Sequence, residues 1–411
     1  MGEEYKVYRY RWVILAVIVP IILCTEMFWL TLAPVSSLAE SYYHVGSMEI
    51  SMFSTSYMIM YILFSLPASW VIDRYGYRCS LIIGTLITVV FAALRAAFAG
   101  NFALALTFQF AIAIGQPFLL NISTKVPANW FPVSERSAAA GILTMAQYLG
   151  YVVAMILSPI LAEGGNIPKL FTVYAVISVV CGAIAVLFTR ERPKTASGPE
   201  AGKEDLSPAS MLKLFRNGSF NFVLIIVFIS MGIFNALLTV IEEILKPRGF
   251  TSDQAGVVGA VFVVAGVAGA VILPIISDKI HRRIPMFIAG MSLLVPLYLG
   301  ITFLHNIVFV SVVAGLAGFT IMGVAPILFQ HGAEVAYPVK EGTSFGLILL
   351  MGQISGILFV LIFEAVSGAV HSPVIPMILF TVATAVEIPI TCRMKESDFL
   401  LESLKTKEKA N

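Results

Sequence analysis

The chain has 411 residues, of which 58% are hydrophobic and 12% are charged, and its mean hydropathy is +0.91. This composition excludes a soluble globular domain and indicates a protein that lies mainly in lipid. The net charge of +2 comes with no basic surface of the kind that binds nucleic acid. Four cysteines and five histidines occur without metal-ligand or disulfide spacing, and no nucleophile or phosphate-loop motif is present, so neither an enzyme nor a cofactor is expected.

Twelve apolar segments are long enough to cross about 30 Å of hydrocarbon, which takes roughly 20 helical residues each. The first six run over residues 12–37, 48–72, 79–99, 102–130, 136–162 and 168–189. The second six run over residues 219–245, 254–277, 284–304, 307–331, 342–368 and 373–392. The sequence therefore predicts an all-α membrane protein, with twelve transmembrane helices in two pseudo-symmetric six-helix bundles.

A polar stretch between the two sets divides the chain. We expect an N-terminal bundle over residues 1–190, a cytoplasmic linker over 191–216, a C-terminal bundle over 217–393 and a cytoplasmic tail over 394–411. With the N-terminus in the cytoplasm, 22 of the 26 lysines and arginines fall on the cytoplasmic side. The positive-inside rule therefore predicts a multi-pass protein of the cell membrane with both termini cytoplasmic.

The two halves repeat each other at an offset of 206 residues. Residues 135–150 read ERSAAAGILTMAQYLG and residues 341–356 read EGTSFGLILLMGQISG, so that Glu135 corresponds to Glu341 and Gln147 to Gln353. A half-length repeat of hydrophobic segments, with an acid and a base in the corresponding loop of each half, is typical of a two-bundle secondary transporter.

Two corresponding loops carry this acid and base. Residues 69–78 read SWVIDRYGYR and residues 274–283 read PIISDKIHRR, which resemble the loop signature of the major facilitator superfamily. Ser69 and Pro274 replace the leading glycine of that signature, and Tyr77 replaces an arginine. The resemblance implies a cytoplasmic latch that breaks when the protein opens inward. The candidate gating residues are Asp73, Arg74, Arg78, Asp278, Lys279, Arg282, Glu135, Glu334 and Glu341.

Two glutamines lie at equal depth in the two halves. Gln147 and Gln353 each follow a cytoplasmic glutamate by 12 residues, which places them about 18 Å along their helices, near the middle of the membrane. Amides at this depth usually face the bundle interior. They are candidates for a central cavity, and the alternative is that they join helices by hydrogen bonds.

Glu26 and Trp29 are three residues apart and share one face of the first span. An indole is the best side-chain surface for an organic cation, although Trp29 could instead anchor the outer leaflet. Glu26 could carry a proton, compensate a cationic substrate or be a neutral structural acid. Asn235 corresponds to Trp29 in the second half. The remaining candidates for the cavity lining are Gln116, Tyr57 and Tyr61.

A narrower resemblance follows from four runs of residues. HGAEVAYPVKEGTSFG at 331–346 and QISGILF at 353–359, with PANWF at 127–131 and AQYLG at 146–150, resemble segments of the feline leukaemia virus subgroup C receptor-related family. This resemblance implies transport of choline or ethanolamine, with Trp29, Gln147 and Gln353 in the pocket. Asn235 stands where that family has a tyrosine, and Glu26 is outside the family's pattern.

Three hypotheses are compatible with these residues. The first is a monomeric secondary active or facilitative transporter that moves a small polar or cationic solute, choline-like or another amine, by rocker-switch alternating access. The second is a proton-coupled organic anion transporter with Glu26 as the coupling acid, for which the candidate bases are Arg95 and Lys125. The third is a membrane receptor that transports nothing.

Overall fold

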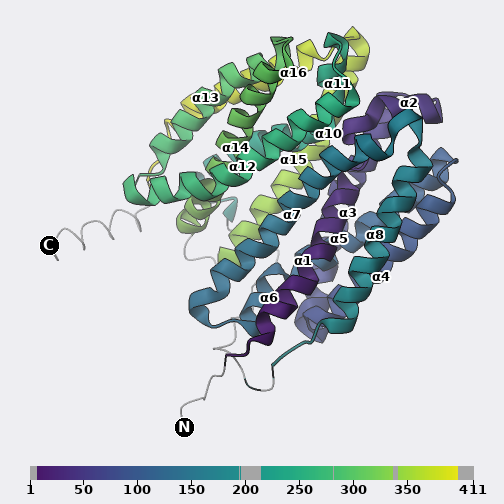
Figure 1. Cartoon of the computed structure of the whole chain (residues 1–411). Coiled ribbons are helices and arrows are strands. Elements are labelled where there is room, and N and C mark those ends of the chain that lie inside the picture. The colour runs from purple at the N-terminus through teal and green to yellow at the C-terminus, as the bar shows by residue number, and fades with distance from the viewer. Residues whose placement is uncertain (1–6, 194, 196–213, 281, 337–340, 397–411) are drawn as a thin grey trace, which may run out of the picture. The chain divides into compact units, whose positions relative to one another are not determined.

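A computed structural model describes residues 7–193, 195, 214–280, 282–336 and 341–396 of the chain. All regular elements in these residues are helices, as the sequence predicted (Figure 1). The chain divides into two compact units, Met1–Lys203 and Glu204–Asn411, and each is described by itself.

The first unit begins with α1, which is followed by a short 3-10 turn and a short second helix. The helices of this unit are α1 (Tyr10–Trp29), η1 (Ala33–Val35), α2 (Ser36–Tyr43), α3 (Ser47–Tyr75), α4 (Tyr77–Ala97), α5 (Phe102–Leu120), α6 (Ile122–Trp130), α7 (Val133–Leu161), η2 (Glu163–Gly165) and α8 (Ile167–Phe188).

The second unit contains α10 (Gly218–Thr239), α11 (Ile241–Leu245), η3 (Lys246–Arg248), α12 (Ser252–Ile280), α13 (Ile284–Phe303), α14 (Ile307–Val335), α15 (Glu341–Val370) and α16 (Val374–Thr391). Among the described residues of both units, twelve helical segments have the length and hydropathy of membrane spans. This number agrees with the two sets of six apolar segments in the sequence.

The same helix pairs pack together in both units. In the first unit α1 packs on α7 and α8, α3 on α5, and α4 on α8. In the second unit the corresponding pairs are α10 with α15 and α16, α12 with α14, and α13 with α16. The internal sequence repeat therefore encodes one six-helix packing twice.

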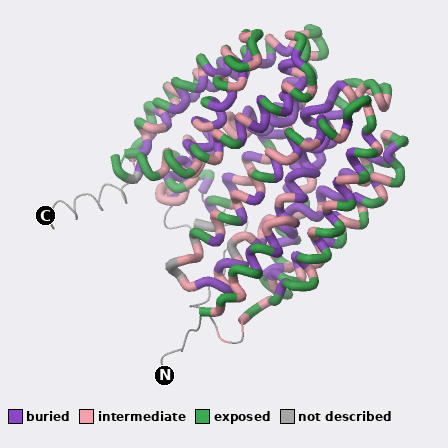
Figure 2. Tube along the Cα trace, in the orientation of Figure 1, coloured by how far each residue is buried: buried purple, intermediate pink, exposed green. Residues whose placement is uncertain are grey.

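The helices are apolar on their outer faces as well as on their inner faces. In α8, for example, Phe171 and Tyr174 are buried, whereas Val176, Val180 and Leu187 are more than half exposed. Figure 2 shows this alternation of buried and exposed positions along the helices of each unit. An apolar face that is not covered by protein is what a helix presents to lipid.

The expected first span, 12–37, is interrupted. Helix α1 ends at Trp29, and Pro34 in η1 cannot supply the backbone N–H that would continue the helix. The hydroxyl of Thr31 donates to the carbonyls of Met27 and Phe28 at 3.2 and 2.9 Å. It thereby satisfies two acceptors that the end of a helix leaves without partners.

Glycines allow α12 and α14 to pack backbone against backbone. A Cβ atom at Gly318 would lie 1.9 Å from the carbonyl oxygen of Phe262, and one at Gly269 would lie 2.0 Å from that of Phe319. Close approach through small residues is the usual way in which helices associate in lipid. No side chain can be added at either position without moving the two helices apart.

Gly318→Ala is therefore expected to lower the unfolding temperature of the detergent-purified protein. Overpacking of this kind typically costs about 1–3 kcal/mol. The matched control is Gly368→Ala in α15, where an added Cβ would meet nothing within 4 Å. Circular dichroism melts of the two variants provide the comparison. Equal melting temperatures would contradict this account of the α12–α14 contact.

Candidate functional site

Glu26 lies within the apolar helix α1 and is 1% exposed. Gln116 of α5 donates an N–H of its side chain to the Oε1 atom of Glu26 at 2.9 Å. The Oε2 atom is buried and has no hydrogen-bond partner among the described residues. Gly150 of α7 lets the helices approach, because a Cβ there would lie 2.8 Å from the Glu26 Cβ. Two predicted site residues are thus in direct contact, and one acceptor oxygen is left over.

Trp29 is the last residue of α1 and is 5% exposed. Its indole N–H donates to the carbonyl of Ser54 in α3, and the Ser54 hydroxyl donates to the carbonyl of Trp29, both at 3.1 Å. The indole meets the ring of Tyr151 in α7 edge to face, with 5.1 Å between centroids. Glu26, Trp29, Ser54, Gln116 and Tyr151 together form what we term the Trp29 cluster.

The other candidates of the first unit lie on the same helices as this cluster. Gln147 is half-buried in α7 and precedes Tyr151 by one helical turn, so both side chains share one face of the helix. Tyr57 is buried in α3, close along the chain to Ser54. Tyr61 takes part in a different contact, because its hydroxyl donates to the Asn121 Oδ1 at 3.1 Å.

Asn121 explains one departure from the superfamily signature. Its Nδ2 lies 3.1 Å from the Ser69 Oγ and within 3.2 Å of the carbonyl and hydroxyl oxygens of Ser65. Serine in place of the signature's glycine therefore supplies an acceptor for the amide at the break between α5 and α6. This network joins α3 to that break.

In the second unit the predicted site residues Asn235 and Gln353 lie on α10 and α15, the helix pair that corresponds to α1 and α7. Asn235 of α10 is 4% exposed and donates through Nδ2 to the carbonyl of Gly352 in α15 at 3.2 Å. Gln353, the next residue, is half-buried. The α10–α15 contact is the counterpart of the α1–α7 contact that Trp29 and Tyr151 make.

Glu387 is a further buried acid, and the sequence did not single it out as a site residue. Glu387 of α16 is 0% exposed and accepts a hydrogen bond from the Ser230 hydroxyl at 2.9 Å. The repeat offset of 206 relates this pair to Cys181 and Cys24, whose thiols lie next to each other in the first unit. A single acid in an apolar run is the signal that singled out Glu26, and it was equally present at Glu387.

The first signature loop makes contacts that differ from a direct acid–base bridge. Asp73 lies 3.9 Å from the Nζ of Lys125, with its side chain 53% exposed. The guanidinium of Arg74 lies 5.6 Å from the ring centroid of Trp70 and 5.8 Å from that of Tyr75. Arg74 is thus held by aromatic rings at the end of α3.

Glu191 is the first residue of the expected linker, and it caps α4. Its carboxylate accepts from the backbone N–H groups of Tyr77 and Arg78 at 3.2 and 2.7 Å. An acid is favourable at the positive end of a helix. Gly76 has a φ of +90°, and a Cβ there would lie 2.5 Å from the Glu191 carboxylate, so glycine is required at this turn.

Glu396 makes the equivalent cap in the second unit. It accepts from the backbone N–H groups of Arg283 and Ile284 at 2.9 and 3.0 Å. Its spacing of 205 residues from Glu191 equals the spacing between Asp73 and Asp278. That offset was the signal that could have identified both capping acids.

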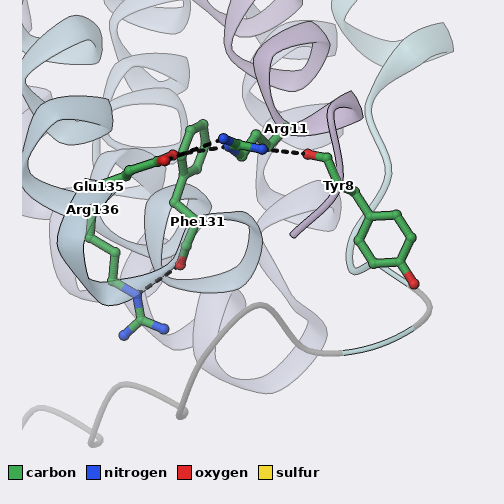
Figure 3. A network of polar contacts seen from close by, with 5 residues as sticks. All are labelled: Tyr8, Arg11, Phe131, Glu135 and Arg136. Atoms are coloured by element: carbon green, nitrogen blue, oxygen red, sulfur yellow. Dashed lines mark hydrogen bonds and ion pairs between the residues drawn. The ribbon is translucent and has the colours of Figure 1, made fainter. Parts of the chain in front are cut away.

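Glu135, a predicted gating residue, pairs with Arg11. The Nε and Nη2 atoms of Arg11 donate to the two carboxylate oxygens at 3.0 and 3.3 Å (Figure 3). Arg11 also donates to the Tyr8 carbonyl at 3.1 Å and lies 5.7 Å from the ring of Phe131. A two-point pair of this kind fixes the start of α1 against the start of α7. Sequence spacing did not identify Arg11 as the partner.

In the second unit Glu334 pairs with Arg283 at 2.6 Å, and both side chains are 9% exposed. Lys279 and Arg282 are exposed. The side chains of Asp278 and Glu341 lie outside the part of the chain that the structure describes. Their predicted roles therefore stay predictions.

Comparison with known proteins identifies relatives over most of the chain. The sequence model of the Major Facilitator Superfamily matches residues 18–360. Solute carrier family 49 member A3 of Danio rerio is 29% identical, with 90% of this chain and 82% of that protein covered. Choline/ethanolamine transporter flvcr2b of Danio rerio is 28% identical, with 87% and 78% covered. Choline/ethanolamine transporter FLVCR2 of Homo sapiens is 25% identical, with 86% and 71% covered.

A solved structure shows the same fold. It is the crystal structure of a bacterial homolog of the human lysosomal transporter Spinster, in an inward-facing and unoccupied conformation. The two chains superpose with a TM-score of 0.77 over 98% of each, at 16% sequence identity. These comparisons confirm the predicted fold class and both family resemblances.

Glu191→Ala is expected to destabilise the protein by about 1 kcal/mol, because the N-terminus of α4 loses its acceptor. Glu191→Gln should cost less, since one side-chain oxygen remains. Glu163→Ala, at an exposed acid in η2 of the same unit, serves as the control for loss of charge alone. Thermal unfolding in detergent measures all three variants. A Glu191→Ala protein as stable as Glu163→Ala would show that the cap contributes nothing.

Proposed function

The chain belongs to the Major Facilitator Superfamily and is a multi-pass membrane transporter, and from that premise we propose that it carries a small organic cation. The substrate is choline-like or another amine, and it binds at the Trp29 cluster together with Gln147. Gln353 and Asn235 are proposed as the substrate-binding residues of the second unit. Transport proceeds by alternating access in a monomer of the cell membrane, with both termini in the cytoplasm.

The single observation that carries this proposal is the position of Trp29 at the end of a broken membrane helix. The C-terminal end of a helix has a partial negative charge, which favours a nearby cation. The indole face attracts the same cation through its quadrupole. Relatives that share most of the chain are named choline/ethanolamine transporters, which agrees with this chemistry.

The buried carboxyl group of Glu26 also favours a cationic substrate. It lies one turn before Trp29, and its Oε2 has no hydrogen-bond partner among the described residues. A carboxylate in an apolar helix is costly unless a cation or a proton neutralises it. We propose that the substrate supplies this positive charge when it binds.

The charged contacts at the helix ends are proposed to act as gates. The Arg11–Glu135 pair joins α1 to α7, and the Arg283–Glu334 pair joins the beginning of α13 to the end of α14. Each pair lies within one unit, so a gating role requires that the joined helices of that unit also move relative to each other during the cycle. Asp73, with Lys125 at 3.9 Å, is the weaker and more exposed candidate.

Trp29→Ala is expected to weaken choline binding about 30-fold, because a desolvated cation–π contact contributes roughly 2 kcal/mol. The measurement is the thermal-stability shift of the detergent-purified protein as a function of the concentration of choline, ethanolamine, betaine and several carboxylates. Trp29→Phe, which keeps a weaker aromatic face, should fall between wild type and Trp29→Ala.

The control is Phe188→Ala, which removes an aromatic ring that is 52% exposed at the end of α8. This variant should bind choline as the wild type does. Stabilisation of the wild type by carboxylates but by no amine, or amine binding that is indifferent to Trp29, would refute the proposed site.

The buried Glu26 carboxyl also supports a second candidate, a proton-coupled organic anion transporter. That function needs a base to hold the anion, and both predicted bases have other partners. Arg95 is 0% exposed and donates to Gln109. Lys125 lies near Asp73, with its side chain 30% exposed. The geometry therefore favours the cation.

Glu26→Gln separates these two functions. For cation transport, choline affinity should fall about tenfold, since the substitution removes one charge and keeps an oxygen that can accept from Gln116. For proton-coupled anion transport, an imposed pH gradient should drive carboxylate uptake by the wild type in liposomes. Glu26→Gln should then abolish this accumulation and leave carboxylate exchange intact.

A further inference from the structure

Arg95 is a fully buried cation to which the described residues offer no counter-ion. It lies in the last turn of α4 and is 0% exposed. No described acid lies within ion-pair distance of it. A guanidinium stays charged in proteins, and a buried charge is costly unless polar or aromatic groups surround it. The groups around Arg95 must therefore stabilise its charge.

Two aromatic rings and one amide surround the guanidinium. The Arg95 Cζ lies 4.0 Å from the ring centroid of Phe171 in α8 and 5.0 Å from that of Phe28 in α1. Its Nη1 donates to the Oε1 of Gln109 in α5. Arg95 thus connects α4 to three other helices of the unit.

Gln109 links Arg95 to α1 and α3 by hydrogen bonds. It is 0% exposed, and its Nε2 donates to the carbonyls of Phe28 and Phe53, both at 3.1 Å. Arginine has only donors, so the Gln109 oxygen must face Arg95. The two N–H groups of the amide then point at the two carbonyls.

Phe28 and Phe53 directly precede Trp29 and Ser54. Trp29 and Ser54 in turn exchange the two hydrogen bonds of 3.1 Å that hold the indole against α3. The amide of Gln109 therefore joins the same two backbone segments one residue earlier. Trp29 is at the end of α1, where no further helical turn would fix it.

We propose that Arg95 and Gln109 are positioning residues that fix the Trp29 indole for the substrate, acting through the Phe28 and Phe53 carbonyls. The proposal rests on the proposed role of Trp29 in binding an organic cation. Neither residue contacts the substrate itself. Arg95 sets the orientation of the Gln109 amide, and the amide sets the register of α1 against α3.

Gln109→Glu tests this assignment with almost no change in shape. The glutamate keeps an acceptor for Arg95 and gives the buried guanidinium an opposite charge, but it loses both N–H donors to the carbonyls. If Gln109 only accepts a hydrogen bond from Arg95, this variant should match or exceed the wild type in stability and bind choline equally well. If Gln109 positions Trp29, choline binding should weaken about tenfold in a folded protein.

A second readout does not depend on the substrate. In a background with Trp12, Trp70 and Trp130 replaced by phenylalanine, fluorescence reports on Trp29 alone. Gln109→Glu should shift the emission maximum and lower the anisotropy of Trp29 in the absence of ligand. Gln254→Glu in the second unit, the same chemical change at the start of α12, should alter neither emission nor affinity.

The outcomes separate the two proposals. If the wild type binds no amine, the proposed function fails, and the Trp29 emission still decides whether Arg95 and Gln109 position the indole. Unchanged emission and choline affinity in folded Gln109→Glu would overturn the inference. So would stabilisation by carboxylates that is lost in Arg95→Gln, because Arg95 would then be an anion site.

Should Gln109→Glu fail to fold, Arg95→Lys takes its place. Lysine keeps the charge but lacks the planar fork that reaches Gln109 from between two rings. Weakened choline binding and a shifted Trp29 emission in this variant would support positioning. Wild-type values for both would overturn it.

Discussion

Lipid offers no hydrogen bonds, so every buried polar group in a membrane unit must find its partner within the protein. The first unit meets this demand around the end of α1, where Trp29 and Ser54 exchange two hydrogen bonds and Gln109 satisfies the carbonyls before them. Glycines at other helix contacts bring backbones close together, so that van der Waals packing holds the helices. The hydrogen bonds at the end of α1 fix the position of Trp29 and thereby the position of the candidate site.

Much of the architecture could be predicted from the sequence, because apolar length and internal repetition depend on the chain alone. Glu26 and Gln116 could each be recognised as a polar group in an apolar helix, but their hydrogen bond could not. Partners across helices were harder, since spacing along one helix does not say which residue faces it. Tyr151 beside Trp29 and Arg11 beside Glu135 are such cases.

The two halves share a packing scheme but differ in chemistry at matching positions. Trp29 corresponds to Asn235, and Glu26 corresponds to Gly232, which lies against the ring of Phe359. The second unit places one of its buried acids, Glu387, where the first has a cysteine. A repeated scaffold therefore carries different side chains at matching positions, and buried charge lies at different places in the two units.

The capping acids Glu191 and Glu396 have a consequence for dissecting the protein. Each follows the last helix of its unit and binds the N-terminus of a helix in that same unit. A division of the chain between residues 203 and 204 leaves both caps with the helices they serve. Each half expressed as a separate polypeptide therefore keeps its own cap, provided that the first extends past residue 191 and the second past residue 396.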